Sequence, residues 1–336
     1  MHNTTTAAYR DIEVIIPAYN AADYIVQTLA SACAQTYKPK YITVVNDSSS
    51  DATAALVQQF AKERAPQGVT VQLRHNTGPR GPSAARNLAL REGKTEWVAF
   101  LDADDLMLPE QLAALAAALA EHEDAVLSFV DSLLFNADGV VVPSLLVSSG
   151  IGSLPATKLS NEVETLGEET FLQLCKTGIF GTSACLFVRA VALEAGAFDE
   201  SMMYCEDTDL FLRMAVRGKF VFSRKVLSQK RIHGSNLTHP KNKYLFCRGT
   251  VYLLAKALGR IRQSSQSAQL LGSATQQACL RMRLHEAVEG YLYHASLGGL
   301  SRYRAAADLC RQAGFATAAW HPRHLARLVS SYVRPT

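Results

Sequence analysis

The chain has 336 residues, 48% of them hydrophobic, enough for one large domain or a domain and a half with a substantial core. Its net charge of +4 is unevenly distributed, since residues 241–336 carry 14 Lys and Arg against three acids, whereas residues 1–240 carry 20 against 27. Gly and Pro are ordinary in number, no repeat occurs, and no stretch reaches the ~18 apolar residues of a membrane span, which argues against repetitive and membrane-spanning architectures.

Strands and helices alternate along the first 105 residues. Short apolar runs predict strands within residues 11–20, 41–50, 69–75 and 96–105, the first of them ended by Pro17, and helical periodicity falls within 21–35, 51–65 and 83–93. Such alternation predicts an α/β fold with a mostly parallel sheet covered on both faces. The clusters "PAYN", "NDSSSD" and "LDADD" follow three of the strands, where ligands of such sheets bind.

The rhythm changes after about residue 123. Strands are predicted at 125–135 and 181–190, a helix at 206–218 and one or two strands at 219–234, while residues 139–166 give no clear pattern. From about residue 241 the chain is predicted to be helical. We therefore place a domain boundary near residue 240.

Three aspartates crowd the end of the predicted strand "WVAFLDADD". Asp102 and Asp104 would point to one side of that strand, because side chains alternate, and two carboxylates there suit Mg²⁺ or Mn²⁺. Asp105 would face away and serve the following helix, in which Pro109 suits an early position. The alternative is that all three acids cap and solvate a turn.

Three further clusters each have a structural and a functional interpretation. Asp47 could accept a hydrogen bond from the imide N–H of a base such as uracil, or could simply form a turn, and Asp51 is expected to cap the next helix. In "EDTDLFLR" Asp209 can pair with Arg213 one helical turn on, which leaves another acid free to act as a general base. His233 matters only if it meets the aspartates, where its imidazole would complete a site that tolerates Mn²⁺.

Taken in order, these stretches resemble glycosyltransferase family 2, the inverting enzymes of the GT-A fold. The resemblance rests on "VIIPAYN", "VVNDSSSD", "NTGPRGPSAARNLA", "FLDADD", "EDTDLFLR" and "RIHGSN", and it covers about residues 11–240. Departures occur, since Asn46 and Ser48 stand where the family pattern has Asp and Gly, the loop from Asn76 to Arg86 is longer than usual, and Ala89 stands where a Gly is common. Asn tolerates unusual backbone angles, so we expect the turn to form.

The resemblance implies a metal-dependent, inverting transfer of a sugar from a nucleotide sugar, with UDP as the expected nucleotide, to a glycan or lipid-linked glycan, as in bacterial cell-surface polysaccharide synthesis. It implies a GT-A domain over 1–240, with a nucleotide-binding half at 1–105 and an acceptor-binding half at 106–240. The implied roles are a nucleotide pocket lined by Pro17, Tyr19, Asn20, Asp47, Arg86, Asp102 and Ala103, a divalent cation (Mn²⁺ or Mg²⁺) on Asp104 with His233, and Asp207 as the base.

The basic region 241–336 matches no motif. Its arginines at 302, 304, 311, 323, 327 and 334 alternate with aromatic residues, which suggests a surface for anionic lipid or an anionic acceptor. A solvated helix bundle or an oligomer interface is the alternative, and no nucleic-acid motif occurs.

The residues also bear on location and on competing functions. The N-terminus lacks the apolar segment of a signal peptide, and seven cysteines form no CxxC pair, so we expect a cytoplasmic protein, peripheral at the inner face of the membrane. A non-catalytic module that binds nucleotide sugar is the main competing interpretation. Phosphatase chemistry is disfavoured because three strands precede "FLDADDL", and dinucleotide chemistry because no G-x-G-x-x-G follows the first strand.

Overall fold

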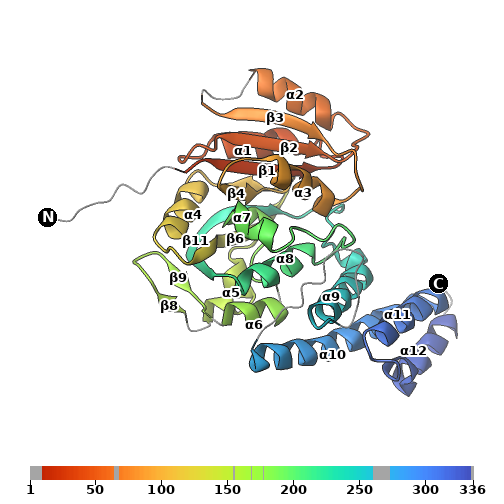
Figure 1. Cartoon of the computed structure of the whole chain (residues 1–336). Coiled ribbons are helices and arrows are strands. Elements are labelled where there is room, and N and C mark those ends of the chain that lie inside the picture. The colour runs from red at the N-terminus through yellow and green to blue at the C-terminus, as the bar shows by residue number, and fades with distance from the viewer. Residues whose placement is uncertain are drawn as a thin grey trace.

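A mixed β-sheet runs through the centre of the molecule (Figure 1). The structure is a computed structural model, which describes residues 10–63, 68–153, 156–167, 169–176, 178–259 and 273–333. Within them the sheet has the strand order β3-β2-β1-β4-β10-β6-β11-β9-β8, with β5 paired to β11 and β7 to β6. The strands are β1 Ile12–Ala18, β2 Tyr41–Asn46, β3 Thr70–His75, β4 Trp97–Phe100, β5 Leu106–Met107, β6 Ala125–Asn136, β7 Gly139–Val142, β8 Thr157–Lys158, β9 Glu164–Thr165, β10 Cys185–Val188 and β11 Lys219–Arg231.

The first half of the sheet is parallel, as predicted. β2 lies between β1 and β3, and β1 lies between β2 and β4, all in parallel register. β1, β2 and β4 are buried almost throughout, which explains their continuous apolar sequences. β1 continues one residue past Pro17, because this proline still pairs with Val45.

The second half mixes strand directions. β10 is antiparallel to β4 and β6, while the long strands β6 and β11 pair in parallel. Residues 139–166, which gave no clear pattern, form β7, a short helix α5 and the small β8–β9 pair that extends the sheet beside β11. Each of these elements is short, and so few residues do not show the hydrophobic periodicity from which a strand or helix is predicted.

Helices cover both faces of the sheet and then form a separate group at the C-terminal end (Figure 1). The longer helices are α1 Ile25–Cys33, α2 Thr53–Glu63, α3 Pro82–Glu92, α4 Gln111–Ala120, α6 Glu169–Lys176, α8 Glu206–Ala215, α9 Lys243–Ala257, α10 Ala274–Leu297, α11 Leu300–Gln312 and α12 Pro322–Val333. The shorter ones are α5 Leu145–Ser148, α7 Arg189–Glu194 and the 3-10 turns η1 Ile151–Ser153, η2 Thr182–Ala184, η3 Pro240–Asn242 and η4 Ala318–Trp320. The described residues after 241 are thus helical, as predicted, and contain no helix long and apolar enough to cross a membrane.

The helix α9 packs directly on the sheet-bearing part of the chain. The ammonium of Lys256 is buried and donates to Asp199 Oδ2 at 2.7 Å and to Asp209 Oδ2 at 2.9 Å. Asp209 Oδ2 also accepts from Arg213 Nη2 at 2.6 Å, the predicted pair one helical turn apart. Gly249 lies so close to Tyr204 that a Cβ at position 249 would meet the Tyr204 carbonyl oxygen at 2.9 Å. The predicted boundary near residue 240 therefore crosses a buried contact.

We expect Lys256→Met to destabilise the protein by about 3–5 kcal/mol, because it leaves a buried carboxylate at Asp199 without its cation. Lys243→Met on the same helix is the matched control, since Lys243 is exposed. Urea unfolding of both variants measures the difference. An equal effect of the two substitutions would contradict a stabilising role for the buried ammonium.

Candidate functional site

The carboxyl ends of β1, β2 and β4 meet at one edge of the sheet. Ala18 pairs with Asn46, and Ile15 pairs with Phe100, so the segments that follow these strands emerge side by side. The backbone N–H of Asp47 donates to Ala18 O at 2.8 Å, which holds the first two loops together. The predicted convergence of the three polar clusters is therefore confirmed.

The three aspartates lie in a turn after β4 rather than on the strand. β4 ends at Phe100, and the alternation of side chains predicted for Asp102 and Asp104 does not apply. Their neighbours differ, because the carboxylate of Asp102 contacts Arg86 and that of Asp104 contacts His233. The prediction for this stretch was right about the place and wrong about the local geometry.

Asp104 and His233 form the centre predicted to hold a metal. His233 Nε2 lies 2.7 Å from Asp104 Oδ2, although 129 residues separate them in the chain. Asn236 Nδ2 donates to the same oxygen at 3.1 Å, and Asn236 Oδ1 accepts from the His233 backbone at 2.6 Å. The imidazole stacks on Tyr24, with 4.8 Å between ring centroids. Burial and the nearby charge of Asp102 raise the pKa of Asp104, against the opposing effect of His233.

The carboxylate of Asp104 and the imidazole of His233 fit a divalent cation that takes its remaining ligands from a bound substrate and water. A carboxylate and an imidazole suit Mn²⁺, and Mg²⁺ would use the carboxylate with waters and phosphate oxygens. Ser235 Oγ lies 2.7 Å from His233 Nδ1, a contact that would hold the ring with Nε2 directed at a bound metal when Nδ1 carries the proton. No group of three or more His, Cys, Asp or Glu side chains able to hold an ion occurs in the described ranges, so a cation here would need further oxygens from substrate and water.

Asp105 is a buried structural residue and not a partner of the following helix. Its Oδ2 accepts from Ser183 Oγ at 2.7 Å and its Oδ1 from the Arg231 backbone at 3.0 Å. Helix α4 begins only at Gln111, two residues after Pro109. Burial first, and then the charge of Asp102, raise the pKa of Asp105 to about 7, while Lys230 opposes this shift. The earlier prediction for Asp105 and for Pro109 was wrong because tertiary contacts outweigh helix proximity here.

Arg86 ties the donor side of the site to helix α8. Its Nη2 donates to Asp102 Oδ1 at 2.7 Å and its Nη1 to Glu206 Oε1 at 3.0 Å, and the guanidinium is buried. Burial acts to raise the pKa of Asp102, but the charges of Arg86 and Lys230 and the hydrogen bonds from Arg86 and Thr182 together outweigh it, and the net shift is downward. Burial and the charge of Asp207 raise the pKa of Glu206 to about 7, against the effect of Arg86.

Asp207 is the acid of the "EDTD" cluster that keeps a free side chain. Glu206 is held by Arg86, and Asp209 by Arg213 and Lys256. Asp207 is half-buried, and among the described residues its carboxylate accepts only from the backbone and hydroxyl of Thr208. The residue before this helix start, Cys205, has a left-handed φ of 61°. The cluster therefore divides as expected, with Asp207 remaining available for chemistry.

We expect Arg86→Met to destabilise the fold by about 3–5 kcal/mol near pH 8, because Glu206 and Asp102 would remain buried without a counter-charge. The folded-state pKa of Glu206 lies above its unfolded value, so this carboxyl favours the folded state only while protonated, and stability falls as pH rises toward and through about 7. The loss relative to wild type should therefore shrink at pH 5.5. Thermal melting at both pH values measures it, and the exposed Arg91→Met is the control.

The residues predicted to line a nucleotide pocket lie around the β1 and β2 loops. Pro17 is half-buried in β1, and Tyr19 is 57% exposed just beyond it. Asn20 has a φ of 48°, and its Oδ1 accepts from the Ser50 backbone at 2.8 Å. Ala103 is buried, and its carbonyl accepts from Thr28 Oγ1 at 2.9 Å. An exposed aromatic ring above these loops is suited to stacking on a base.

Asp47 is buried and holds the loop that precedes α3. Its Oδ2 accepts from the Gly81 backbone at 2.8 Å and its Oδ1 from Asn76 Nδ2 at 2.6 Å. Each carboxylate oxygen has two lone pairs, so a base N–H could still be accepted. The left-handed backbone in this turn falls on Ser48, with a φ of 62°, and not on Asn46, which ends β2. Ser48, which stands where the family pattern has Gly, thus adopts a backbone angle that glycine adopts readily. Asp51 accepts from the Thr53 backbone at 3.0 Å, as expected at the start of α2.

Several residues of the site were missed from the sequence. Thr182 and Ser183 of η2 contact the carboxylates of Asp102 and Asp105, and the Ser183 hydroxyl also accepts from the Asp102 backbone at 3.0 Å. Nothing in their local sequence marks them, because their role comes from a strand paired to β4. Asn236 was readable in principle, since an Asn three residues after a His can hydrogen-bond its backbone.

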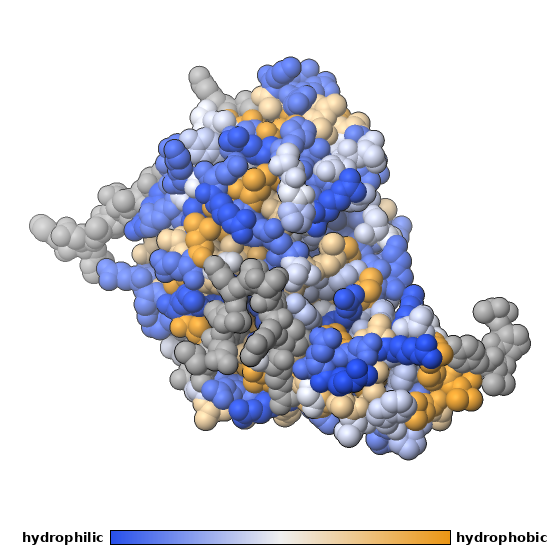
Figure 2. Space-filling model, turned by 45° about the vertical axis from the view of Figure 1, so that its right-hand side comes forward, coloured by the Kyte–Doolittle hydropathy of each residue, from blue (hydrophilic) through white to orange (hydrophobic). Residues whose placement is uncertain are grey.

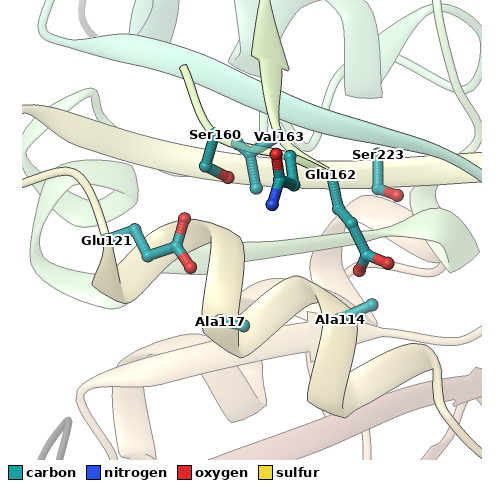
Figure 3. Close-up of a pocket in the computed structure, with 8 residues that line it drawn as sticks. Ala114, Ala117, Glu121, Ser160, Glu162, Val163 and Ser223 are labelled. Carbon is teal, nitrogen blue, oxygen red and sulfur yellow. The ribbon is translucent and has the colours of Figure 1, made fainter. Parts of the chain in front are cut away.

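Two cavities lie away from this edge of the sheet. One of about 220 Å³ lies between α4 and the residues around β8 and β9 (Figure 3). Another of about 490 Å³ is lined by residues of α6, the end of α8 and the start of β11. Neither is lined by the aspartates or His233.

Solved structures share this fold. The chain aligns with S. aureus TarS residues 1–349 in complex with UDP-GlcNAc at a TM-score of 0.59 and 17% identity, covering 96% of this chain and 89% of that one. A mannosyltransferase from Pyrobaculum calidifontis in complex with GDP-Man and Mn²⁺ aligns at 0.58 and 20% identity, covering 97% and 87%. The architecture is therefore that of the GT-A glycosyltransferases.

The sequence comparisons give matches over part of the chain. Residues 13–139 match the family model described as Glycosyl transferase family 2, and the chain carries a domain of this family. An uncharacterized glycosyltransferase of Rickettsia typhi is 28% identical over 68% of this chain and 66% of its own length. The succinoglycan biosynthesis protein ExoO of Rhizobium meliloti is 38% identical over 30% of this chain and 28% of its own. The matches thus span less than two thirds of these relatives.

Proposed function

We propose that this protein is a metal-dependent, inverting glycosyltransferase that moves a sugar from a nucleotide sugar, with UDP as the nucleotide, to a hydroxyl of a glycan or lipid-linked glycan. The observation that carries the proposal is the convergence of three groups at one sheet edge. These are the Asp104–His233 pair, the Arg86 bridge between Asp102 and Glu206, and the free carboxylate of Asp207. The family domain over residues 13–139 supports it.

The chemistry assigned to the chain is one displacement. Asp207 accepts the proton of the acceptor hydroxyl while that oxygen forms a bond to the anomeric carbon. The bond from this carbon to the diphosphate oxygen breaks, and its electron pair leaves with the nucleoside diphosphate. Attack from the opposite side inverts the anomeric configuration, so one carboxylate base suffices. A divalent cation held by Asp104 and His233 would supply charge stabilisation for the departing diphosphate.

The names of similar proteins support a class of donor and a role for this proposal. TarS is named a poly(ribitol-phosphate) β-N-acetylglucosaminyltransferase and was solved with UDP-GlcNAc, and ExoO is named for succinoglycan biosynthesis. These names support a nucleotide-sugar donor and a role in cell-surface polysaccharide synthesis. The mannosyltransferase complex with GDP-Man makes guanine the second base to examine.

A panel of nucleotide sugars with Mn²⁺ or Mg²⁺ tests this function. Thermal shift and slow donor hydrolysis need no acceptor, and the proposal expects one UDP-sugar to stand out in both. Binding of a donor with neither hydrolysis nor transfer to any acceptor in a glycan panel would favour the competing proposal of a non-catalytic module. The absence of any nucleotide-sugar binding would contradict both.

We further propose that the region 241–336 meets an anionic membrane surface from the cytoplasmic side. Trp320 is 72% exposed and Val329 64%, and Figure 2 shows hydrophobic atoms among hydrophilic ones at this end of the molecule. Some arginines are already engaged, since Arg311 pairs with Asp308 and Arg323 with Glu289. Arg334 lies outside the described residues.

We expect the protein to co-sediment with vesicles containing phosphatidylserine at low salt and to be released by high salt, because charge attraction is screened. Trp320→Ser should weaken binding, whereas Val140→Ser, at an exposed apolar position of β7, is the control. No sedimentation at low salt would exclude the membrane and leave an acceptor or a second subunit as the partner of this region.

A further inference from the structure

Lys230 is a cation of the site that neither the family motifs nor the proposed chemistry uses. It lies on β11, where it pairs with Leu134 of β6. Side chains alternate along a strand, so Lys230 shares a face with Ser228, whose hydroxyl is directed at the Ser183 carbonyl. Ser183 in turn contacts Asp105 and the backbone of Asp102. This face of β11 therefore looks toward the aspartate turn.

The ammonium of Lys230 lies in the electrostatic field of several carboxylates of the described residues but forms no hydrogen bond with them. Burial acts to lower the pKa of Lys230, but the charges of Asp105, Asp102, Asp207 and Asp104 together raise it. The Lys230 ammonium nevertheless makes no hydrogen bond, and no ion pair within 4.0 Å, with any residue that the structure describes. It is half-buried, so its three N–H donors remain open to a ligand.

The other cations of the site already have partners. Arg86 is shared by Asp102 and Glu206, Arg231 Nε donates to the Asp104 carbonyl at 2.9 Å, and His233 contacts Asp104. A purely structural role for Lys230 would be to pair with the deeply buried Asp105. Both oxygens of Asp105 accept hydrogen bonds from Ser183 and Arg231, and the Lys230 ammonium forms neither a hydrogen bond nor an ion pair with this carboxylate in the described residues.

We propose that Lys230 binds an oxygen of the donor's diphosphate and stays on it as the nucleoside diphosphate leaves. This inference rests on the proposed function and adds a cation that belongs to the protein itself. Lys230 lies within the field of both Asp102, on the nucleotide side, and Asp207, on the acceptor side. It transfers no proton, since the acceptor proton goes to Asp207, and it compensates the charge that develops on the phosphate oxygen.

Calorimetric binding of uridine, UMP and UDP in the presence of EDTA tests the proposal without metal and without turnover. We expect the wild type to prefer UDP to UMP. Lys230→Met should lose about 10- to 100-fold in UDP affinity, the size of one hydrogen bond to a charged group, and keep its uridine affinity. Lys230→Arg should retain most of the UDP affinity. Guanosine, GMP and GDP are measured in parallel.

Lys225→Met is the matched control, because Lys225 lies on the same strand but is exposed and pairs with Glu162 at 2.7 Å. An unchanged preference for the diphosphate in Lys230→Met would overturn the inference and leave the proposed function standing. A wild type that binds no nucleotide of either base, with or without Mn²⁺, would instead overturn the proposed function itself.

Folding is checked by melting temperature, with Lys230→Gln as a second variant of similar length. If Lys230→Met and Lys230→Gln both unfold while Lys230→Arg folds, Lys230 is a structural counter-ion for Asp102 and Asp105, and the inference fails. Folded variants with weakened UDP binding support it. Under turnover conditions, the same variants should lower kcat with their uridine affinity unchanged, a pattern that loss of packing would not give.

Discussion

Asp207→Asn should lower kcat for sugar transfer by about 100- to 10,000-fold and leave binding of UDP and the melting temperature close to wild type. Removal of a general base has an effect of this size, and an amide of the same shape cannot accept the acceptor proton. The fold should persist because, within the described residues, the Asp207 carboxylate contacts only Thr208. Single-turnover kinetics, with calorimetry of UDP, separate the two effects.

Asp124→Asn is the control for this substitution, since Asp124 is an exposed acid paired with Lys219. Full activity of Asp207→Asn would transfer the base role to Glu206 or Asp209. The structure makes that transfer costly, because Arg86 holds Glu206, and Arg213 and Lys256 hold Asp209. Activity that survives in all three single variants would contradict catalysis by this helix.

Asp104→Asn should abolish the stimulation of activity by Mn²⁺ or Mg²⁺ and reduce turnover by about 100-fold or more, because a cation at a developing phosphate charge contributes several kcal/mol. Treatment of the wild type with EDTA should produce the same loss, and added Mn²⁺ should reverse it. UDP affinity measured in EDTA should be the same in the variant and the wild type. Titration with Mn²⁺, followed by thermal shift, measures the affinity of the protein for the metal in the variant and the wild type.

Asn236→Ala provides a graded version of the same experiment. Asn236 donates to Asp104 Oδ2 and accepts from the His233 backbone, so its loss should weaken Mn²⁺ binding by about 10- to 100-fold without removing either expected ligand. Ser153→Ala is the control, because the Ser153 hydroxyl is exposed and donates only to the nearby Gly150 carbonyl in the described residues. Unchanged Mn²⁺ dependence in both Asp104→Asn and Asn236→Ala would place the cation elsewhere.

The sheet edge was predictable because its signals are local. The strands β1, β2 and β4 are continuous apolar runs, each followed at once by polar residues, and parallel strands bring such ends together. The pairing of Asp209 with Arg213 was predictable for a similar reason, since helix geometry alone brings residues four apart into contact.

Side-chain partners across the chain were not predictable in this way. Asp105 looked like a helix partner because α4 follows it, yet Ser183 and the Arg231 backbone, 78 and 126 residues away, determine its environment. Asn46 looked like the residue for an unusual backbone angle, and Ser48 adopts it instead. Propensity ranks residue types, whereas the hydrogen bonds of a particular turn select the position.

The sequence by itself determined the parallel sheet, the position of the polar clusters at its edge and the helical end of the chain, because these depend on periodicity and on neighbours in the chain. Only the tertiary structure decided how the acids divide. It pairs Asp102 with Arg86, joins Asp104 to His233, buries Asp105 and leaves Asp207 and Lys230 open. The physical reason is that the charge and availability of a carboxylate depend on groups brought within hydrogen-bonding distance by folding. Those groups come from other elements of the chain, from Arg86, 16 residues before Asp102, to His233, 129 residues after Asp104.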